Sequence, residues 1–438
     1  MINFDPAQVL AAAKASKSLA TTARFWTGKL ILNMSDEAYV LDVVDGVPTD
    51  FRRDDAPLSG DVALGECDIV VSGPSASWDK LLSKVPPPGF HDAIFGAGGA
   101  GFSLAGNGIT AIGPFYWPAQ EFIMLLRRVR NATPEPEVLP EVDRDFDTAV
   151  GRYMYIHVQG TQYRIYYEEA GHGDIPLIMQ HTAGADSRQW RHVMEDSDYQ
   201  KMYRMIAYDL PFHGRSLPPT SKPWWHEQYK LSRSFLMDTI VAISKRLGLD
   251  RPVFMGCSIG GLLAPDLAYY HSDDFRAVIG LNSGLGLDPE MIEMVEANFA
   301  VWSNPRVGAQ WTTALNRAQL APTSPEPYRR ETTFVYSQGT PALNEGDLFY
   351  YSRDHDLTAE QASQIDTSKT AVYLITGGYD GLAFPGGTDR LAKAIKGCHY
   401  EVVHDLGHFG PAENPDECKT ALLPILQEIA AKSLVEAG

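Results

Sequence analysis

The sequence predicts an α/β protein in which helices cover both faces of a mostly parallel, eight-stranded sheet. From Tyr153 onward, short apolar strands alternate with helical segments. The apolar strand at 253–255 runs into a G-x-S-x-G turn centred on Ser258, and helical spacing follows it. A segment rich in proline and acidic residues, 133–147, precedes this region and has the composition of an extended linker.

This pattern predicts two domains of unequal size. A small α+β domain is expected at residues 1–132 and an α/β domain at residues 148–438, joined by the linker at 133–147. Within the larger domain, residues 286–368 are helical in character and separate two expected strands. We refer to residues 286–368 as the insertion.

Composition limits the class of protein. Hydrophobic residues make up 44% and charged residues 21% of the 438 residues, which is ordinary for a globular protein. The formal net charge of −18 argues against nucleic acid or an anionic membrane as the main partner. We expect a small-molecule substrate, and the sequence leaves a homodimer open.

The cysteines and the N-terminus indicate the cellular compartment. The four cysteines lack the spacing of a zinc site, so we expect buried free thiols in a reducing compartment: Cys67, Cys257, Cys398 and Cys418. The apolar run at 9–13 is too short for a signal peptide or a membrane span. These features favour a cytoplasmic protein without a membrane span.

The N-terminal region mixes strands and helices. Helices are expected at 10–23, from an N-cap at Ser77, and at 119–129, with strands at 28–34, 38–44 and 67–72. The glycine-rich run at 96–101 lacks the strand, helix and acidic residue of a dinucleotide-binding loop, and a flexible turn is expected there.

A resemblance follows from the order of these pieces. The run Ile69-Val70-Val71-Ser72-Gly73-Pro74 before Trp78, then Ala105-Gly106-Asn107 and a closing helix, resembles sterol-carrier-protein-2-like domains over about residues 20–130. The resemblance implies an α/β fold with an apolar tunnel for lipid-like ligands, and it carries no catalytic residue. The aromatic residues here fit a tunnel, a dimer interface or an ordinary core.

Strands and helices of the larger domain can be placed in order. A hairpin is expected from 152–158 and 161–168, turning at Gln159-Gly160. The further expected strands are 175–179, 203–208, 253–255, 277–281, 371–376 and 400–403, and the expected helices outside the insertion are 189–194, 236–247, 262–270 and 418–432.

Ser258 is the candidate nucleophile. A serine on so sharp a turn has a strained backbone and an exposed hydroxyl, and the flanking glycines let the chain pass closely. A serine nucleophile also needs a base, an acid that orients the base, and donors for the oxyanion.

His408 is the expected base. It lies in Gly407-His408-Phe409 on a loop just after a strand. His404 at the end of that strand and His399 before it are less suitably placed.

Asp380 is the expected acid, because it directly follows the strand at 371–376 and a carboxylate there can reach the histidine loop. Asp288, after the preceding strand, is the alternative.

The oxyanion donors are expected to be backbone N–H groups. Ile259 follows the nucleophile, and the turn His181-Thr182-Ala183-Gly184 follows a buried strand. Ala183 is preferred over Thr182 as the second donor. His181 is expected to fix this turn by hydrogen bonds rather than to act as a base.

Five landmarks in this order strongly resemble the α/β-hydrolase superfamily over residues 150–435. They are the His181 to Gly184 turn, Asp209 with Gly214-Arg215-Ser216, the Ser258 turn, the strand ending at Asp380, and Gly407-His408-Phe409. The resemblance implies a Ser258–His408–Asp380 triad. Thr182 departs from the usual His-Gly turn, and a serine at 258 argues against epoxide or carbon–halogen cleavage, which use aspartate.

The insertion lies where such hydrolases carry a lid over the active site. It is aromatic, and Trp302, Trp311 and Tyr350 are candidates for binding a bulky apolar or aromatic substrate. Packing of the same residues against the core is an equal alternative.

These residues together predict hydrolysis of a carboxylic ester or lactone through an acyl-enzyme, without a metal or organic cofactor. Two alternatives stay open: hydrolysis of a carbon–carbon bond in a ring-cleavage diketone, and a non-catalytic protein that binds a lipid-like ligand.

Overall fold

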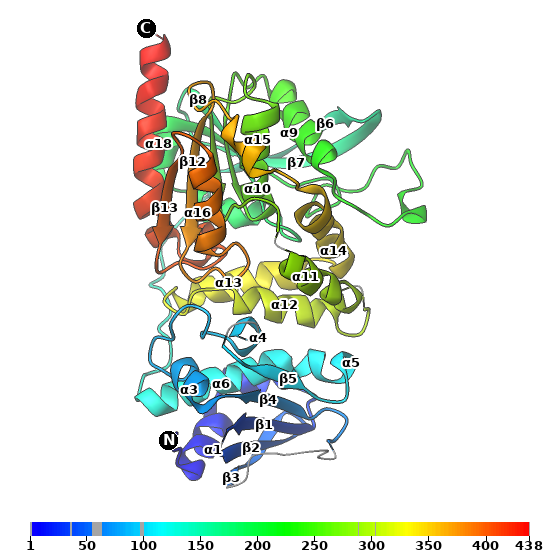
Figure 1. Ribbon diagram of the computed structural model, residues 1–438, viewed down its shortest axis with the longest axis vertical. Helices are drawn as coiled ribbons and strands as arrows, with labels where there is room; N and C mark the ends of the chain where they lie inside the picture. Colours follow the sequence, from blue (N-terminus) through cyan, green and yellow to red (C-terminus); the bar gives the residue numbers. More distant parts are fainter. Residues whose placement is uncertain are drawn as a thin grey trace. The chain divides into compact units, whose positions relative to one another are not determined.

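A computed structural model describes residues 2–35, 37–54, 64–96, 100–287, 289–302 and 304–437. The chain forms two compact units (Figure 1). The larger unit comprises Leu139–Ser303 and Pro327–Gly438, and the N-terminal unit comprises Met1–Val138 and Asn304–Glu326. Residues 133–147 between the two form neither helix nor strand.

The larger unit is built on the eight-stranded sheet that the sequence predicts. Its strand order is β13-β12-β11-β10-β8-β9-β7-β6. The strands are β6 (Val150–Val158), β7 (Thr161–Ala170), β8 (Ile175–Gln180), β9 (Tyr203–Tyr208), β10 (Val253–Cys257), β11 (Ala277–Leu281), β12 (Ala371–Gly377) and β13 (His399–Val403). The six from β8 to β13 are parallel, and β6 and β7 form the expected antiparallel hairpin at one edge.

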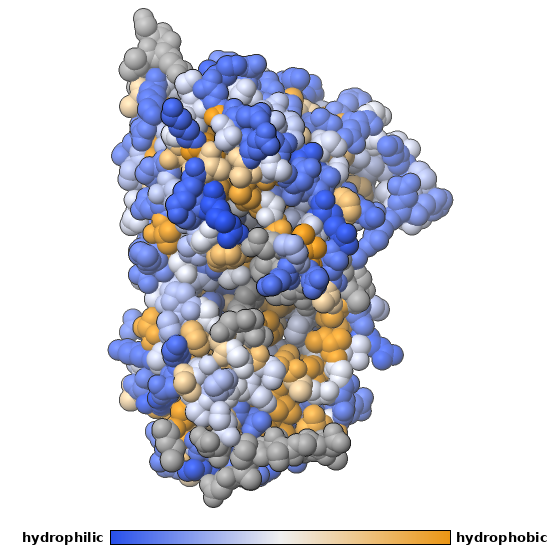
Figure 2. Space-filling model, viewed as in Figure 1, coloured by the Kyte–Doolittle hydropathy of each residue, from blue (hydrophilic) through white to orange (hydrophobic). Residues whose placement is uncertain are grey.

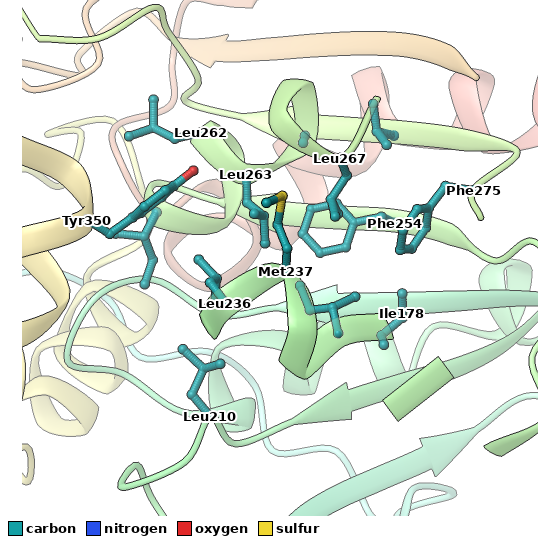
Figure 3. Packing of buried hydrophobic residues seen from close by; sticks show 14 of the residues in the cluster. Ile178, Leu210, Leu236, Met237, Phe254, Leu262, Leu263, Leu267, Phe275 and Tyr350 are labelled. Atoms are coloured by element: carbon teal, nitrogen blue, oxygen red, sulfur yellow. The ribbon is translucent and has the colours of Figure 1, made fainter. Parts of the chain in front are cut away.

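Alternate side chains of each buried strand pack against helices on opposite faces, as a period of two requires. Phe254 faces α9 (Arg233–Leu247) and α10 (Ile259–Tyr270) in one core, part of which Figure 3 shows. Its neighbours Val253 and Met255 face a second core that includes α7 (Arg191–Met194), α8 (Ser197–Met202) and α18 (Pro415–Ala437). α15 (Ala359–Ser363) and α16 (Pro385–Ala394) complete the first face. The predicted α/β fold is thus confirmed.

The insertion between β11 and β12 is mainly helical. It contains α11 (Pro289–Trp302), α12 (Gly308–Ala318), α13 (Glu326–Ser337), α14 (Pro341–Phe349) and one π-helical turn (Tyr350–Asp354). Four of these five elements belong wholly or mainly to the larger unit, whereas α12 lies in the segment Asn304–Glu326 of the N-terminal unit.

The N-terminal unit has a five-stranded sheet in the order β3-β2-β1-β4-β5. Its strands are β1 (Gly28–Met34), β2 (Glu37–Val44), β3 (Val47–Asp54), β4 (Ile69–Gly73) and β5 (Ser103–Ala105), and its helices include α1 (Pro6–Ala15), α2 (Lys17–Thr22), α3 (Ser75–Leu81), α4 (Ala93–Gly96), α5 (Ile109–Ile112) and α6 (Tyr116–Asn131). The sequence patterns did not indicate β3 or β5.

Three local expectations need correction. The helix predicted at 10–23 is two helices, because the hydroxyl of Ser16 accepts the N–H of Leu19 and caps a new helix. Ser77 does not cap α3, which begins at Ser75; its hydroxyl donates to the carbonyl of Ala100 instead. Cys67 and Cys398 are free thiols but only partly buried. Part of the glycine-rich run at 96–101 lies outside the described residues.

Segment Asn304–Glu326 packs on helix α6 of the same unit. Trp311 of α12 lies against Tyr116, with ring centroids 5.8 Å apart. Arg317 is 2% exposed, and its guanidinium lies 3.2 Å from the carboxylate of Glu121 on α6. Because a buried guanidinium is costly unless it is paired, this contact fixes how α12 lies on α6.

Figure 2 shows mainly hydrophilic residues over the visible face of the larger unit. In the described part of the chain, no helix combines the length and apolarity that a membrane crossing needs.

Candidate active site

Ser258 stands on a sharp turn between β10 and α10. Its backbone has φ 57° and ψ −111°, a strained combination for a residue with a side chain. The turn is tight because a Cβ on Gly256 would lie 2.4 Å from the backbone carbonyl of Gly260. The N–H of Ser258 donates to Leu281 at 3.0 Å, which ties the turn to the end of β11. The local sequence therefore presents this serine at the C-terminal edge of the sheet, where sites of α/β proteins form.

Asp380 follows β12 at the same edge. One of its carboxylate oxygens, Oδ1, accepts the N–H groups of Leu382 at 2.8 Å and Ala383 at 3.0 Å. The other, Oδ2, lies 2.7 Å from Nδ1 of His408, and both side chains are buried. The two acceptor bonds fix the plane of the carboxylate, so the second oxygen is held in place for the imidazole.

The His408 loop is held from two sides. Glu413, which is fully buried, accepts the N–H groups of Gly407 at 3.0 Å and Phe409 at 2.9 Å, on either side of the histidine. The carbonyl of His408 accepts from Nδ2 of Asn282 at 2.6 Å and from Sγ of Cys257 at 3.2 Å. Cys257 directly precedes Ser258, so the histidine loop lies against the serine turn.

Cys257 has a structural role in holding the histidine loop. Burial raises the pKa of its thiol well above the ordinary value, and the thiol donates to the His408 carbonyl. A protonated, buried thiol is a poor nucleophile. The other histidines near β13, His399 and His404, are exposed. Asp288, the alternative acid, lies outside the described residues.

The turn after β8 leaves the N–H group of Ala183 available among the residues that the structure describes. The N–H of Thr182 donates to Gln189 at 2.8 Å, and the N–H of Gly184 donates to Asp347 at 2.7 Å. Between them, the N–H of Ala183 donates to no group in the described part of the chain. The N–H of Ile259, at the first position of α10, lacks an intrahelical acceptor as helix starts do.

His181 fixes the same turn. Its Nε2 accepts the N–H of Leu210 at 3.1 Å, so Nδ1 carries the proton and donates to the carbonyl of Thr182 at 2.8 Å. Burial, followed by repulsion from His213, lowers the pKa of His181 to about 4. A neutral imidazole with both nitrogens engaged is a structural group.

The insertion contributes a tyrosine to this edge. The hydroxyl of Tyr336 on α13 hydrogen-bonds the hydroxyl of Thr182, and its ring lies 4.9 Å from that of Phe409. Burial raises the pKa of Tyr336 well above the ordinary value, so the hydroxyl keeps its proton. Tyr336 thus contacts both the turn after β8 and the residue following His408.

Two further buried histidine–aspartate pairs link the insertion to other parts of the same unit. Nε2 of His213 lies 2.8 Å from Oδ2 of Asp347, and Nδ1 of His355 lies 3.1 Å from Oδ2 of Asp266 on α10. Burial alone would lower the pKa of each histidine, but the facing carboxylate outweighs it and the pKa of each is raised. Both pairs fasten the insertion to the rest of the larger unit.

The proposed substrate-binding residues fall in different places. Trp311 packs on Tyr116 within the N-terminal unit. Tyr350 is buried in the larger unit, and its hydroxyl donates to Asp266 at 2.7 Å. Trp302 ends α11, and its side chain lies outside the described residues.

Sequence reasoning gave no supporting role to four residues of the site: Asn282, Asp347, Glu413 and Tyr336, the last of which it noted only among the aromatic residues of the insertion. Each of these residues either lies far in the sequence from the group that it binds or is part of no recognisable sequence motif. The only local signal was the short spacing between His408 and Glu413. Among the described residues, no group of three or more His, Cys, Asp and Glu side chains is arranged to hold a metal ion.

The chain is similar to known hydrolases. It is 25% identical over 151 residues to a 2-hydroxy-6-oxononadienedioate/2-hydroxy-6-oxononatrienedioate hydrolase of Burkholderia vietnamiensis, a match that spans 34% of this chain and half of that relative. Among solved structures, an esterase from Thermogutta terrifontis has a TM-score of 0.55 at 16% identity, over 64% of this chain and 99% of that one. The enol-lactonase from Burkholderia xenovorans has a TM-score of 0.53 at 20% identity, over 63% and 100%.

Residues 175–415 match a protein family whose description is the alpha/beta hydrolase fold. This stretch contains the strands β8 to β13, the serine turn, Asp380 and His408. It makes up more than half of the chain. The chain therefore belongs to the α/β-hydrolase family.

Proposed function

We propose that the protein is a serine hydrolase that cleaves a carboxylic ester or lactone through Ser258, His408 and Asp380. The observation that carries this proposal is the 2.7 Å contact between Nδ1 of His408 and Oδ2 of Asp380, on a loop that touches the residue preceding Ser258. A buried carboxylate on Nδ1 leaves Nε2 as the proton acceptor, which a serine nucleophile requires.

The reaction would proceed in two halves. Oγ of Ser258 attacks the carbonyl carbon while Nε2 of His408 takes its proton. The tetrahedral oxyanion receives hydrogen bonds from the N–H groups of Ile259 and Ala183. His408 then protonates the leaving alcohol, and an acyl-enzyme remains. Water, deprotonated by His408, attacks the acyl carbon and releases the acid and free Ser258.

An apolar substrate suits the surroundings of the serine. A small hollow beside α10 is lined by apolar side chains together with Ser283 and Arg390; the apolar ones are Leu262, Leu285, Leu287, Tyr351, Leu382, Ala383 and Phe384. The N–H of Leu262 donates to the carbonyl of Ser258, and the N–H groups of Leu382 and Ala383 hold the Asp380 carboxylate. We propose that an apolar or aromatic acyl or alcohol group packs against these side chains, and that the insertion acts as a lid.

The test is covalent labelling of the full chain with an aryl fluorophosphonate, together with hydrolysis of a panel of aryl esters and aryl lactones. Labelling and hydrolysis that both disappear in Ser258→Ala support the proposal. Absence of labelling in the wild type, or labelling that persists in Ser258→Ala, contradicts it. Asp389→Asn, an exposed carboxylate paired with Lys393 on α16, is the matched control.

Hydrolysis of a carbon–carbon bond in a ring-cleavage diketone is a second candidate, favoured by the name of the Burkholderia vietnamiensis relative. The same three residues would serve, with water attacking the ketone carbon. A vinylogous diketone assayed beside the ester panel separates the two reactions. Faster turnover of the diketone, lost in Ser258→Ala, would favour carbon–carbon cleavage.

For the N-terminal unit, we propose a sterol-carrier-protein-2-like role in binding a lipid-like ligand. Its five-stranded sheet and its apolar core, which includes Trp26, Phe51 and Phe122, support this proposal. Displacement of a fluorescent fatty acid from the full chain tests it, and a Ser258→Ala protein that binds as well as wild type would separate this site from the active site.

A further inference from the structure

Asp347 makes an unusual set of contacts for a residue of the insertion. It lies on α14 and its side chain is fully buried. Oδ2 accepts the N–H of Gly184 at 2.7 Å and faces Nε2 of His213 at 2.8 Å, and Oδ1 accepts the hydroxyl of Tyr229 at 3.0 Å. One carboxylate of the insertion therefore binds the turn after β8 directly.

Gly184 is the residue next to Ala183, the proposed oxyanion donor. The bond from Gly184 to Asp347 fixes the peptide plane that follows Ala183. The preceding plane is fixed as well, because the carbonyl of Thr182 accepts from His181. The direction of the Ala183 N–H group thus depends on the bond from His181 before it and on the bond to Asp347 after it, and Asp347 belongs to the insertion.

The insertion touches this turn at two more points. The hydroxyl of Tyr336 binds the hydroxyl of Thr182. Gly339, between α13 and α14, lies so close that a Cβ there would be 2.8 Å from the carbonyl oxygen of Gly184. Residues 336–347 therefore hold Thr182 and Gly184, the neighbours of Ala183 on both sides.

His213 keeps the buried carboxylate balanced in charge. Its Nδ1 lies 3.0 Å from the carbonyl of Pro211 and its Nε2 faces Asp347, so both ring nitrogens face acceptors. An imidazole that donates from both nitrogens is an imidazolium. Like His408 and Asp380, these two residues form a buried histidine–aspartate pair. In Asp347, however, one oxygen, Oδ2, contacts both the imidazole and the backbone N–H of Gly184.

We propose that Asp347 is a positioning residue that aims the Ala183 N–H at the oxyanion, so that the insertion completes the oxyanion hole rather than only covering it. This inference rests on the proposed serine hydrolase function. An oxyanion donor must lie 2.7–3.1 Å from the developing charge, and loss of one such donor costs about 10²–10³-fold in kcat. A small displacement of the turn therefore has a measurable effect.

The experiment compares variants of the full chain, with kcat expressed per active site titrated by an aryl fluorophosphonate. Asp347→Ala removes the acceptor for Gly184, and we expect kcat to fall by about 10²-fold with KM changed less than about threefold. Asp347→Asn keeps an oxygen for Gly184, and we expect it to restore most of that loss. Glu345→Ala, on the same helix and bonded only to Gln228 in the described contacts, should match the wild type.

A transition-state mimic gives an independent readout. An aryl trifluoromethyl ketone forms a hemiketal oxyanion on a serine nucleophile, so its inhibition constant should rise in Asp347→Ala by the same factor as kcat/KM falls. A role limited to stability would lower the melting temperature without changing kcat per titrated site or this inhibition constant.

If Asp347→Ala does not fold, the double variant Asp347→Leu/His213→Leu replaces the buried pair with apolar groups, a change that folds often tolerate. It still lacks the acceptor for Gly184, so the same fall in kcat is expected. Wild-type kcat per titrated site in either variant overturns the inference alone. A wild-type chain that is not labelled, or labelling that persists in Ser258→Ala, overturns both the inference and the proposed function.

Discussion

Asp380 uses its two carboxylate oxygens for different purposes. Oδ1 accepts the N–H groups of Leu382 and Ala383, whereas Oδ2 lies 2.7 Å from Nδ1 of His408. The carboxylate is therefore immobilised by its own loop before it contacts the imidazole. Such an arrangement selects the tautomer of His408 in which Nε2 is unprotonated.

Asp380→Asn should inactivate the enzyme without unfolding it. An amide at this position can donate to Nδ1 and stabilise the tautomer with the proton on Nε2, which cannot accept a proton from serine. We expect kcat for an aryl ester to fall by about 10⁴-fold with a small change in melting temperature. Asp389→Asn should match the wild type. If Asp288→Asn shows the large loss instead, the acid is Asp288.

Glu413→Ala should destabilise the histidine loop. It would leave the N–H groups of Gly407 and Phe409 buried without their acceptor, at a cost of about 2–4 kcal/mol in the free energy of unfolding. We also expect a lower kcat, because the loop carries His408. Urea unfolding and ester hydrolysis measure the two effects. Glu401→Ala on β13, which is exposed, should change neither; equal stability of Glu413→Ala and wild type would contradict this account.

Glu121→Ala should destabilise the N-terminal unit, because the buried Arg317 would lose the buried carboxylate of Glu121 and keep the partly buried one of Glu326 at 3.0 Å. Removal of one partner of a buried pair costs about 3 kcal/mol in the free energy of unfolding. The double variant Glu121→Leu/Arg317→Met should recover part of this loss. Asp389→Ala, which breaks the exposed pair with Lys393, should cost under about 0.5 kcal/mol. Equal losses in the two single variants would refute the prediction.

The His213–Asp347 pair should make stability depend on pH. Asp347, Tyr229, His181 and Asp209 surround His213, and although burial opposes it, the Asp347 charge raises the pKa of His213 above its ordinary 6.5. A raised pKa in the folded state gives stability that is fully present below pH 6.5 and lost as the pH rises through the folded value.

Urea unfolding at pH 6, 7.5 and 9 tests this relationship. The free energy of unfolding of the wild type should exceed that of His213→Gln by the largest amount at pH 6 and by less at pH 9. The His355–Asp266 pair titrates in the same direction, but it is present in both proteins and cancels in the difference. A difference that grows with pH would contradict the assigned imidazolium.

The serine turn could be predicted because its constraints are local. Gly256 and Gly260 meet within five residues, and a strand and a helix flank them, so sequence spacing alone describes the geometry. Asp380 and His408 could be proposed because each follows a strand of a parallel sheet, whose carboxyl ends share one edge. The structure brings these two together at 2.7 Å.

The supporting residues could not be predicted for the opposite reason. Asp347 is 163 residues from Gly184, and Asn282 is 126 residues from His408. Nothing in the sequence near an aspartate or an asparagine states which distant backbone group it will meet. Likewise, the amphipathic pattern of α12 predicts a helix with one apolar face, but not that this face packs on α6.

Segment Asn304–Glu326 makes the covalent connectivity of the protein different from that of two domains in tandem. The polypeptide passes between the units three times, after Val138, after Ser303 and after Glu326. After a single cut of the backbone in the linker, segment Asn304–Glu326 would stay covalently joined at both ends to the larger unit and packed on α6 of the N-terminal unit. A gene fragment that begins after the linker would encode Trp311 and Arg317 without helix α6, on which they pack. Exchange of the N-terminal unit between proteins therefore also requires transfer of the stretch that encodes Asn304–Glu326, which lies inside the hydrolase part of the gene.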